Sequence, residues 1–327
     1  MTRRRSILAG VTLVLTLAGL AALPFGLRSY GIYLISTWLV MTIAAMGLNL
    51  TLGYAGQVSM AQAAFVGIGA YTAALLTTQG WPFGVAFLAA GAISFVIGWG
   101  LGYPALRVQH HYLAFVTLAF TTLAYLVFRN EDWLTGGITG ISGIPRPAVL
   151  GWKTGSAVAF YHFCLGVLAL LAAALWWILR SSWGRAFVAL RENPVRAQSL
   201  GVDTRRYTLI AFALGSAYGG FAGALYAPLV QFVDPTPFGL GLSLNLLLMV
   251  VVGGAGTFFG PFLGALVAVL LPEWLRFTEG YYLILYALLV MVLMAVCPTG
   301  LLGLADRLVR PARRSQTPAS AAEETVR

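Results

Sequence analysis

The stretch LNLTLGYAGQVSMAQAAFVGIGAYTAALL, residues 48–76, is too apolar for a surface loop, yet it carries amides and glycines near its centre. Its polar side chains include Asn49, Gln57, Ser59 and Gln62, and its glycines are Gly53, Gly56, Gly67 and Gly69. Buried polar groups need hydrogen-bond partners, and glycines allow two backbones to approach closely. The medium that surrounds such a stretch follows from the composition of the whole chain.

Only 9% of the 327 residues are charged, and 59% are hydrophobic. A soluble domain usually holds about 25% charged residues, so this chain has too few to cover a surface in contact with water. Several apolar runs reach the roughly 20 residues that a helix needs to cross a bilayer. These run lengths disfavour a soluble protein with an unusually apolar core. They predict an all-α integral membrane protein.

Pro, Gly and charged residues divide the apolar sequence into about ten transmembrane helices. They are expected near residues 6–24, 31–50, 57–77, 84–106, 112–128, 157–179, 207–227, 238–254, 257–275 and 281–297. The transmembrane domain would then occupy residues 1–303, followed by a polar cytoplasmic tail, 304–327. A cleaved signal peptide is the alternative for the first span, although its apolar run is longer than the usual stretch of about 7–15 residues.

The basic residues predict which side faces the cytoplasm, because cytoplasmic loops collect Lys and Arg. Ten spans place both termini on one side, together with the segment 180–206. Five of the 20 basic residues then lie on the opposite side: Arg28, Arg129, Arg146, Lys153 and Arg276. The remaining fifteen lie with the termini, so both termini are expected in the cytoplasm. This pattern explains the net charge of +10 without nucleic-acid binding.

Groups for catalysis or ion coupling are missing from the expected positions. Lys153 is the only lysine, and no glycine-rich phosphate-binding loop precedes it. The ten acidic residues fall in loops or at span ends, whereas an ion-coupled carrier usually places a carboxylate in mid-membrane. No catalytic triad or metal-ligand spacing is present either. We therefore predict neither an enzyme nor a bound metal or cofactor.

The segment RSSWGRAFVALRENPVRAQSLGVDTRR, residues 180–206, contains the signals of a short helix. Asn193 is a good N-cap, Pro194 suits the first helical position, and Gly201 suits the left-handed position after the helix. A helix over 194–200 is too short to be stable alone. It should dock on the membrane face of this protein or on a partner, unless the segment is a plain cytoplasmic turn. Arg191 and Glu192, just before the cap, are expected to be exposed and to contribute little to stability.

Four motifs carry a resemblance to a known family. RENPVRAQSLGV resembles the ATPase-coupling loop of ABC-importer permeases, with Ala197 and Gly201 at the places of the motif's Ala and Gly. GLNLTLGYAGQVSMAQAAFVGIGAY, LTGGITGISGIP and VVGGAGTFFGP are similar to the LivM-type permeases of branched-chain amino-acid transporters. The resemblance covers roughly residues 31–303. Pro194 stands where the family often has an acid, and Arg196 where it often has Ala.

The resemblance implies a permease subunit of an ABC importer for branched-chain or related amino acids, in the bacterial inner membrane. The implied partners are a second, LivH-type permease, two separate ATPase subunits and a periplasmic binding protein. The implied coupling residues are Arg191, Glu192, Asn193, Pro194, Ala197 and Gly201. The alternatives are a secondary transporter or channel for a small neutral or zwitterionic solute, and urea or short amides as the cargo.

Two interpretations stay open for the polar residues of the opening stretch. Asn49, Gln57, Ser59 and Gln62 either line the translocation path or hold helices together, because neutral hydrogen-bonding groups suit both roles. Five glycines elsewhere in the chain have the spacing of helix-packing faces: Gly215, Gly219, Gly223, Gly260 and Gly264. The motif LTGGITGISGIP, residues 134–145 of the external loop 129–155, either contacts the binding protein or serves as a flexible linker.

Overall fold

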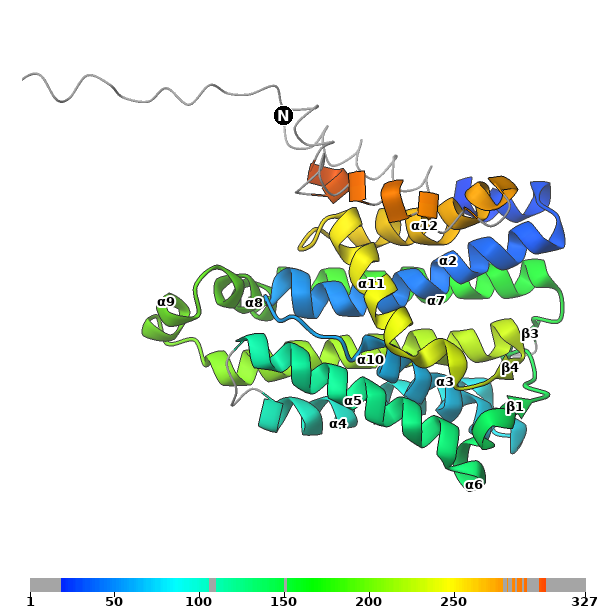
Figure 1. The fold of residues 1–327 in the computed structure, drawn as a ribbon, viewed down its shortest axis with the longest axis horizontal. Coiled ribbons are helices and arrows are strands. Elements are labelled where there is room, and N and C mark those ends of the chain that lie inside the picture. Colours follow the sequence, from blue (N-terminus) through cyan, green and yellow to red (C-terminus); the bar gives the residue numbers. More distant parts are fainter. Residues whose placement is uncertain are drawn as a thin grey trace, which may run out of the picture.

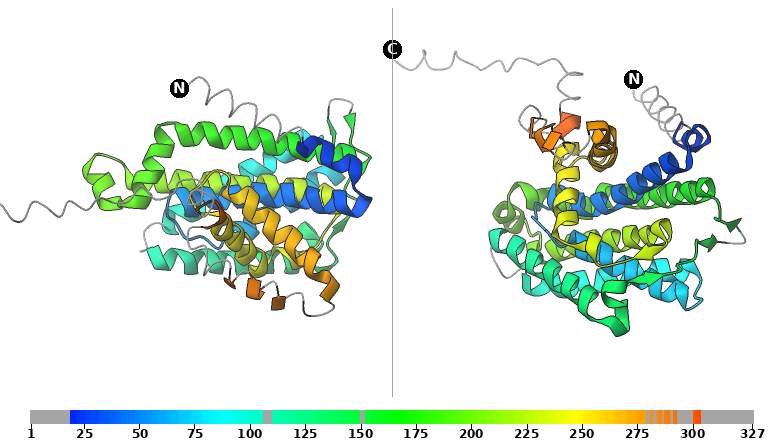
Figure 2. Two further views of the ribbon diagram at one scale, coloured as in Figure 1. Left: turned by 90° about the horizontal axis from the view of Figure 1, so that it is seen from above. Right: turned by 45° about the vertical axis from the view of Figure 1, so that its right-hand side comes forward.

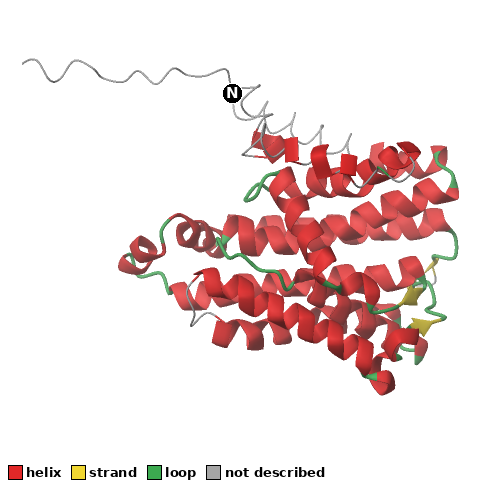
Figure 3. Cartoon of the chain, viewed as in Figure 1, coloured by secondary structure: helices red, strands yellow, loops and turns green. Residues whose placement is uncertain are grey.

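A computed structural model describes residues 19–105, 110–149, 152–278, 281, 284–285, 287–289, 291–292 and 300–303. Its longer helices are α2 (Ser29–Leu48), α3 (Gln62–Thr78), α4 (Phe83–Ala105), α5 (His110–Asn130), α7 (Ala157–Arg180), α10 (Thr204–Val230), α11 (Leu240–Gly253) and α12 (Gly260–Trp274). Its shorter helices are α6 (Asp132–Thr135), α8 (Ser182–Glu192) and α9 (Pro194–Ser199). The protein is thus built almost entirely from helices (Figure 3).

Short segments connect these helices. A π-helical turn, η2 (Asn49–Tyr54), follows α2, and 3-10 turns are η1 (Leu23–Gly26), η3 (Gly137–Thr139), η4 (Thr236–Phe238) and η5 (Leu275–Thr278). The strands are β1 (Ile141–Ser142), β2 (Ala148–Val149), β3 (Trp152–Lys153) and β4 (Phe232–Val233). β1 pairs antiparallel with β4, with Ile141 opposite Val233, and β2 pairs with β3. Part of the loop at residues 129–155, which is predicted to be external, is therefore tied to the end of α10 and is not a free linker.

Six helices in the described part of the chain are long and apolar enough to cross a membrane. They cover Ser29–Tyr54, Phe83–Tyr103, Leu113–Asn130, Ala157–Arg180, Thr204–Val230 and Gly260–Phe277, while Gln62–Thr78 and Leu240–Gly253 are shorter apolar helices. The prediction of an all-α membrane protein is confirmed. Most of the predicted first and tenth spans and the tail 304–327 lie outside the described residues, so the count of ten and the position of the termini stay predictions.

The long helices lie side by side between two ends of the molecule (Figure 1). α8 and α9 project at one end, and the short strands gather at the other, as the turned views of Figure 2 also show. α11 differs from the rest because it crosses the long helices at a steep angle. It contacts α2, α3 and α12, and so joins the two halves of the chain.

α10 is the central helix, packed against α2, α3 and α4. Its glycines allow this close approach: a Cβ atom on Gly223 would lie 1.9 Å from the carbonyl oxygen of Val66, and one on Gly215 2.7 Å from that of Gly47. A Cβ on Gly219 would lie 2.9 Å from the Cβ of Phe65. The three glycines at intervals of four residues therefore face the opening stretch, as small residues do in membrane helix pairs.

The contact between α11 and α12 is equally close. A Cβ atom on Gly264 would lie 1.7 Å from the carbonyl oxygen of Met249, and one on Gly260 would lie 2.4 Å from that of Gly254. α12 is also tied to α2, because the indole N–H of Trp38 donates to the carbonyl oxygen of Phe262 at 3.0 Å. These contacts hold the turn between α11 and α12, residues 254–259, near the end of α2.

Candidate functional site

The sequence predicts one helix over residues 57–77, but the structure contains a break there. α2 continues into the π-helical turn η2, and residues 55–61 are not helical. The Gln57 N–H donates to the carbonyl oxygen of Thr51 at 2.9 Å, and Gly56 adopts a positive φ of 71°. This arrangement ends the helix in the way that left-handed glycines end helices. The predicted start of the third span was therefore wrong, because Gly56 turns the chain and α3 begins only at Gln62.

Hydroxyl groups from two other helices satisfy the backbone of this break. The Met60 N–H donates to the Thr117 hydroxyl at 3.0 Å, and the Met60 carbonyl accepts from the hydroxyls of Thr121 and Ser243 at 2.7 and 2.6 Å. Ser243 also accepts from the Ala63 N–H at 3.1 Å. Irregular backbone at membrane depth requires such partners. These three residues were not predicted, because their only signal in the sequence is a hydroxyl inside an apolar run.

The four residues of the predicted path are buried in this chain, each with no more than 4% of its surface exposed. The amide of Gln62 donates to the carbonyl oxygens of Ala44 in α2 and Gly215 in α10, at 3.0 and 3.1 Å. Ser59 accepts from the Ala61 N–H at 3.3 Å. These bonds favour the helix-holding interpretation for Gln62 within a single subunit.

Gln57 has a different arrangement. Its amide nitrogen donates to the carbonyl oxygen of Thr208 at 2.9 Å, near the start of α10. Its side-chain carbonyl oxygen is buried and has no hydrogen-bond partner among the described residues. A buried polar atom without a partner is unfavourable, so this oxygen is available to water or to a passing solute. Among the four residues, Gln57 therefore has the strongest structural support for a place along a path.

Asn49 joins the break to the turn between α11 and α12. Its side-chain nitrogen donates to the carbonyl oxygen of Thr257, and its side-chain oxygen accepts from the Gly256 N–H, each at 2.9 Å. Asn49 thus uses both ends of its amide on one segment more than 200 residues away in sequence. This pairing fixes η2 against residues 254–259.

Arg191 approaches the same place from α8. Arg191 is exposed, as predicted, but its guanidinium nitrogen Nη1 donates to the carbonyl oxygen of Gly53 at 2.5 Å. This contact was not predicted, because a residue beside a short surface helix gives no sequence signal for a partner 138 positions away. Glu192, the next residue, is exposed. The two residues therefore have different surroundings, and only Arg191 contacts the break.

The short helix α9 has the cap and the end that the sequence predicts. The Asn193 side chain accepts from the Arg196 N–H at 3.0 Å, Pro194 occupies the first turn, and Gly201 has a φ of 85°. The helix ends at Ser199, one residue before the predicted end. Ala197 is buried, and the Val202 N–H donates to its carbonyl oxygen at 3.0 Å.

Two apolar side chains of this projection remain uncovered. Val195 is 75% exposed and Leu200 84% exposed. Leu200 also borders a hollow of about 360 Å³ between α8 and the turn after α9, lined by Ser182, Arg185, Ala186, Ala189, Leu200, Gly201, Val202 and Tyr207. A two-turn helix with exposed apolar residues needs a surface to dock on. Within the described part of this chain, no element covers Val195 and Leu200 at this end of the molecule.

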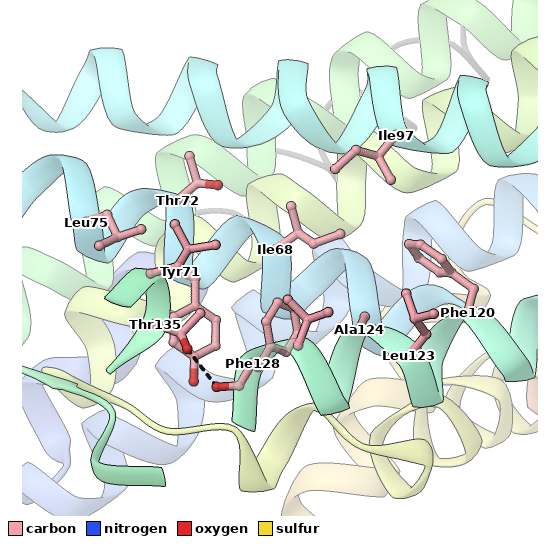
Figure 4. Close-up of a pocket in the computed structure, with 12 residues that line it drawn as sticks. Ile68, Tyr71, Thr72, Leu75, Ile97, Phe120, Leu123, Ala124, Phe128 and Thr135 are labelled. Carbon is pink, nitrogen blue, oxygen red and sulfur yellow. Dashed lines mark hydrogen bonds between the residues drawn. The ribbon is translucent and has the colours of Figure 1, made fainter. Parts of the chain in front are cut away.

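A second cavity, of about 320 Å³, lies between α3, α4 and α5 (Figure 4). It is lined by Ile68, Tyr71, Thr72, Leu75, Ile97, Phe120, Leu123, Ala124, Val127, Phe128, Leu134 and Thr135. Thr135 donates its hydroxyl to the Phe128 carbonyl at 2.7 Å. None of the lining residues is charged, and the polar groups among them are the hydroxyls of Tyr71, Thr72 and Thr135 in an otherwise apolar wall. We do not place a solute site there.

No group of three or more His, Cys, Asp or Glu residues that could hold a metal ion occurs in the described part of the chain. The interior polar groups are instead amides, hydroxyls and backbone carbonyls. Such groups bind neutral or zwitterionic solutes weakly and can also hold helices together.

Comparison with known proteins gives a consistent result. A family model described as "Branched-chain amino acid transport system / permease component" matches residues 30–294. The high-affinity branched-chain amino acid transport system permease protein LivM of Escherichia coli is 33% identical over 314 residues, which cover 89% of this chain and 74% of that protein. LivM of Salmonella typhimurium is 33% identical over 305 residues, covering 86% and 72%.

A relative that matches less of the chain is named for another cargo. The autoinducer 2 import system permease protein LsrC of Klebsiella pneumoniae is 31% identical over 202 residues, which cover 57% of this chain and 54% of that protein. No solved structure matches the chain significantly.

Proposed function

Because the chain belongs to the family of permease components of branched-chain amino-acid transport systems, we propose that it is one membrane subunit of an ATP-driven importer. Permease components move a solute across a membrane and are not an enzyme family. The cargo we propose is a branched-chain or chemically related amino acid. The longer coverage of the LivM relatives supports this cargo over the one named for LsrC.

The observation that carries the proposal is the projecting pair α8 and α9. Its capped helix, its left-handed Gly201 and its uncovered Val195 and Leu200 form a preformed docking element at one end of the membrane helices. A separate ATPase subunit is the partner that this element would serve, since the chain has no phosphate-binding loop of its own. Ala197 would stabilise this docking element, because its side chain is buried and its carbonyl accepts from the Val202 N–H in the turn after α9.

The source of energy follows from where the acidic residues lie. The described acids are Glu131, Asp132, Glu192, Asp203, Asp234 and Glu273, and each stands in a loop or within two residues of a helix end. An ion-coupled carrier needs a ligand for its ion near mid-membrane. ATP hydrolysis on a partner chain supplies the energy without such a ligand.

The subunit is proposed to form half of a path, with a second, LivH-type permease as the other half. A single path between two subunits would explain why Asn49, Ser59 and Gln62 are already paired inside this chain, whereas the side-chain oxygen of Gln57 is not. A periplasmic binding protein would deliver the cargo, so that much of the selectivity would lie outside this chain. These partners place the complex in the bacterial inner membrane.

Reconstitution tests the proposal directly. The chain is assembled in liposomes with its second permease and ATPase subunits, and leucine-loaded binding protein is added on one side. The proposal expects leucine uptake only when ATP is present at the ATPase. Uptake that proceeds equally without ATP would establish a secondary transporter or channel instead.

A further inference from the structure

Three separate parts of the chain meet around one guanidinium group. Arg191 lies at the end of α8, Gly53 in the π-helical turn η2, and Gly256 in the turn between α11 and α12. Nη1 of Arg191 donates to the Gly53 carbonyl at 2.5 Å. A Cβ atom on Gly256 would lie 1.9 Å from the same nitrogen, so the guanidinium fills the space that a side chain there would need. We call Arg191, Gly53, Asn49 and Gly256 the junction.

Gly53 in the junction leaves room for Asn49, and Gly56 beside the junction leaves room for Arg191. A Cβ atom on Gly53 would lie 2.1 Å from the Asn49 side-chain oxygen, and one on Gly56 would lie 3.2 Å from the Arg191 Cα atom. Gly56 and Gly256 also have positive φ angles, which side chains rarely adopt. The backbone around Arg191 is thus shaped to hold its stem and its charged group closely.

The chemistry of the contact suits the end of a helix. The last turn of a helix leaves carbonyl groups without partners inside the helix, and positive charge is favourable there. The Gly53 carbonyl lies in the last turn of η2, and Arg191 supplies a charged donor from another element. Bonds to a charged donor are stronger than neutral ones. Asn49 fastens the same turn to residues 256 and 257 from its other side.

We propose that Arg191 is a positioning residue for transport. Through its bond to Gly53, it transmits a movement of α8 and α9 to the helix break at residues 49–61. This inference rests on the proposed function, because it assumes that an ATPase acts on α8 and α9. Without the guanidinium, α8 would move without pulling on Gly53. The break would then no longer follow the ATPase cycle.

The test compares leucine uptake with ATP hydrolysis in the reconstituted complex. The quantity measured is the number of leucine molecules transported for each ATP hydrolysed, for the wild type, Arg191→Ala and Arg191→Lys. Arg205→Ala is the matched control, because Arg205 is an exposed arginine in the first turn of α10, in the same cytoplasmic segment. We expect a drop of at least tenfold in this ratio for Arg191→Ala, with ATP hydrolysis retained, and no change for Arg205→Ala.

Lysine tests the contact itself. Arg191→Lys retains a positively charged donor on a long side chain, so it should keep at least a third of the wild-type ratio. The lysine variant alone decides the matter if the alanine variant does not assemble. The proposal would be overturned if Arg191→Ala transported as much leucine for each ATP as the wild type. It would also be overturned if Arg191→Lys assembled but its ratio fell tenfold, as is expected for Arg191→Ala. Absence of ATP-driven uptake in the wild type would contradict the proposed function, which is a different result.

Discussion

Gln62 in α3 donates its side-chain amide to the carbonyl oxygen of Gly215 in α10, with 3.1 Å between the two atoms. The same nitrogen lies 3.0 Å from the carbonyl oxygen of Ala44 in α2. One side chain thus connects three buried helices. The lack of a side chain on Gly215 brings its backbone within reach.

Replacing Gln62 by Leu should lower stability modestly. An interhelical hydrogen bond in a membrane protein contributes about 0.6 kcal/mol, and at most about 1.7 kcal/mol. Thermal unfolding of the protein in detergent should therefore show a lower midpoint for Gln62→Leu. The control is Gln79→Leu, since Gln79 is exposed at the end of α3. Equal midpoints for the two variants would show that the amide does not hold the helices together.

Gln57→Leu should affect transport more than assembly. The side-chain oxygen of Gln57 has no partner among the described residues. The substitution therefore removes only one hydrogen bond, the one that the amide nitrogen donates to the Thr208 carbonyl. We expect the complex to assemble at close to wild-type yield, with leucine uptake reduced at least tenfold. Size-exclusion chromatography and uptake are measured on the same preparation. Loss of assembly together with uptake would favour the helix-holding interpretation for this residue as well.

Gly201→Val should disturb the end of α9 and spare the membrane helices. Its φ of 85° costs a residue with a side chain roughly 1 kcal/mol or more, and a β-branched residue is especially unfavourable there. The variant should insert and pair with its partner permease, while loaded binding protein no longer stimulates ATP hydrolysis. Gly155→Val is the control, because Gly155 lies in an open part of the external loop. Full stimulation in Gly201→Val would remove α9 from the coupling mechanism.

Gly223→Ala should destabilise the helix packing. Its Cβ atom would lie 1.9 Å from the Val66 carbonyl oxygen, and overpacking of this kind costs typically about 1–3 kcal/mol. Gly100→Ala adds the same methyl group in α4 where no atom lies within 4 Å, and alanine is a better helix former than glycine. The thermal midpoint should fall for the first variant only. A fall of similar size in both variants would contradict a specific contact at Gly223.

The predicted topology has a chemical test. In a variant without native cysteines, a cysteine in place of Thr139 should react with an impermeant thiol reagent in intact cells, because Thr139 is exposed in the loop that the topology predicts to be external. A cysteine in place of Ser315, in the tail outside the described residues, should resist the reagent. Labelling at position 315 from outside would contradict ten spans with cytoplasmic termini.

The sequence predicts well those features that depend on neighbours along the chain. The cap at Asn193, the left-handed Gly201 and most helix bounds follow from local preferences and run lengths. The sequence places the interruption at residues 51–56, between two predicted spans, but the structure has it at 55–61, because residues 57–61 read as part of the next apolar run. The stabilising partners of this break, Thr117 and Ser243, come from helices that are distant in sequence.

The contact of Arg191 is unpredictable for the same reason. Nothing near position 191 indicates that η2 and the turn at 254–259 fold beside it. Hydrogen bonds across more than a hundred residues depend on how helices are arranged, and periodicity gives no information about that arrangement. The sequence therefore indicates which polar groups are buried but not which groups they contact.

The three hydroxyls on Met60 have a consequence for how this membrane protein tolerates change. Thr121→Val keeps the side-chain volume and makes α5 more hydrophobic, so it should favour insertion of that helix into the bilayer. The same change removes a donor from the Met60 carbonyl, which then loses one of its two side-chain bonds. At Thr117, Thr121 and Ser243, selection for efficient insertion and selection for the folded break thus act in opposite directions.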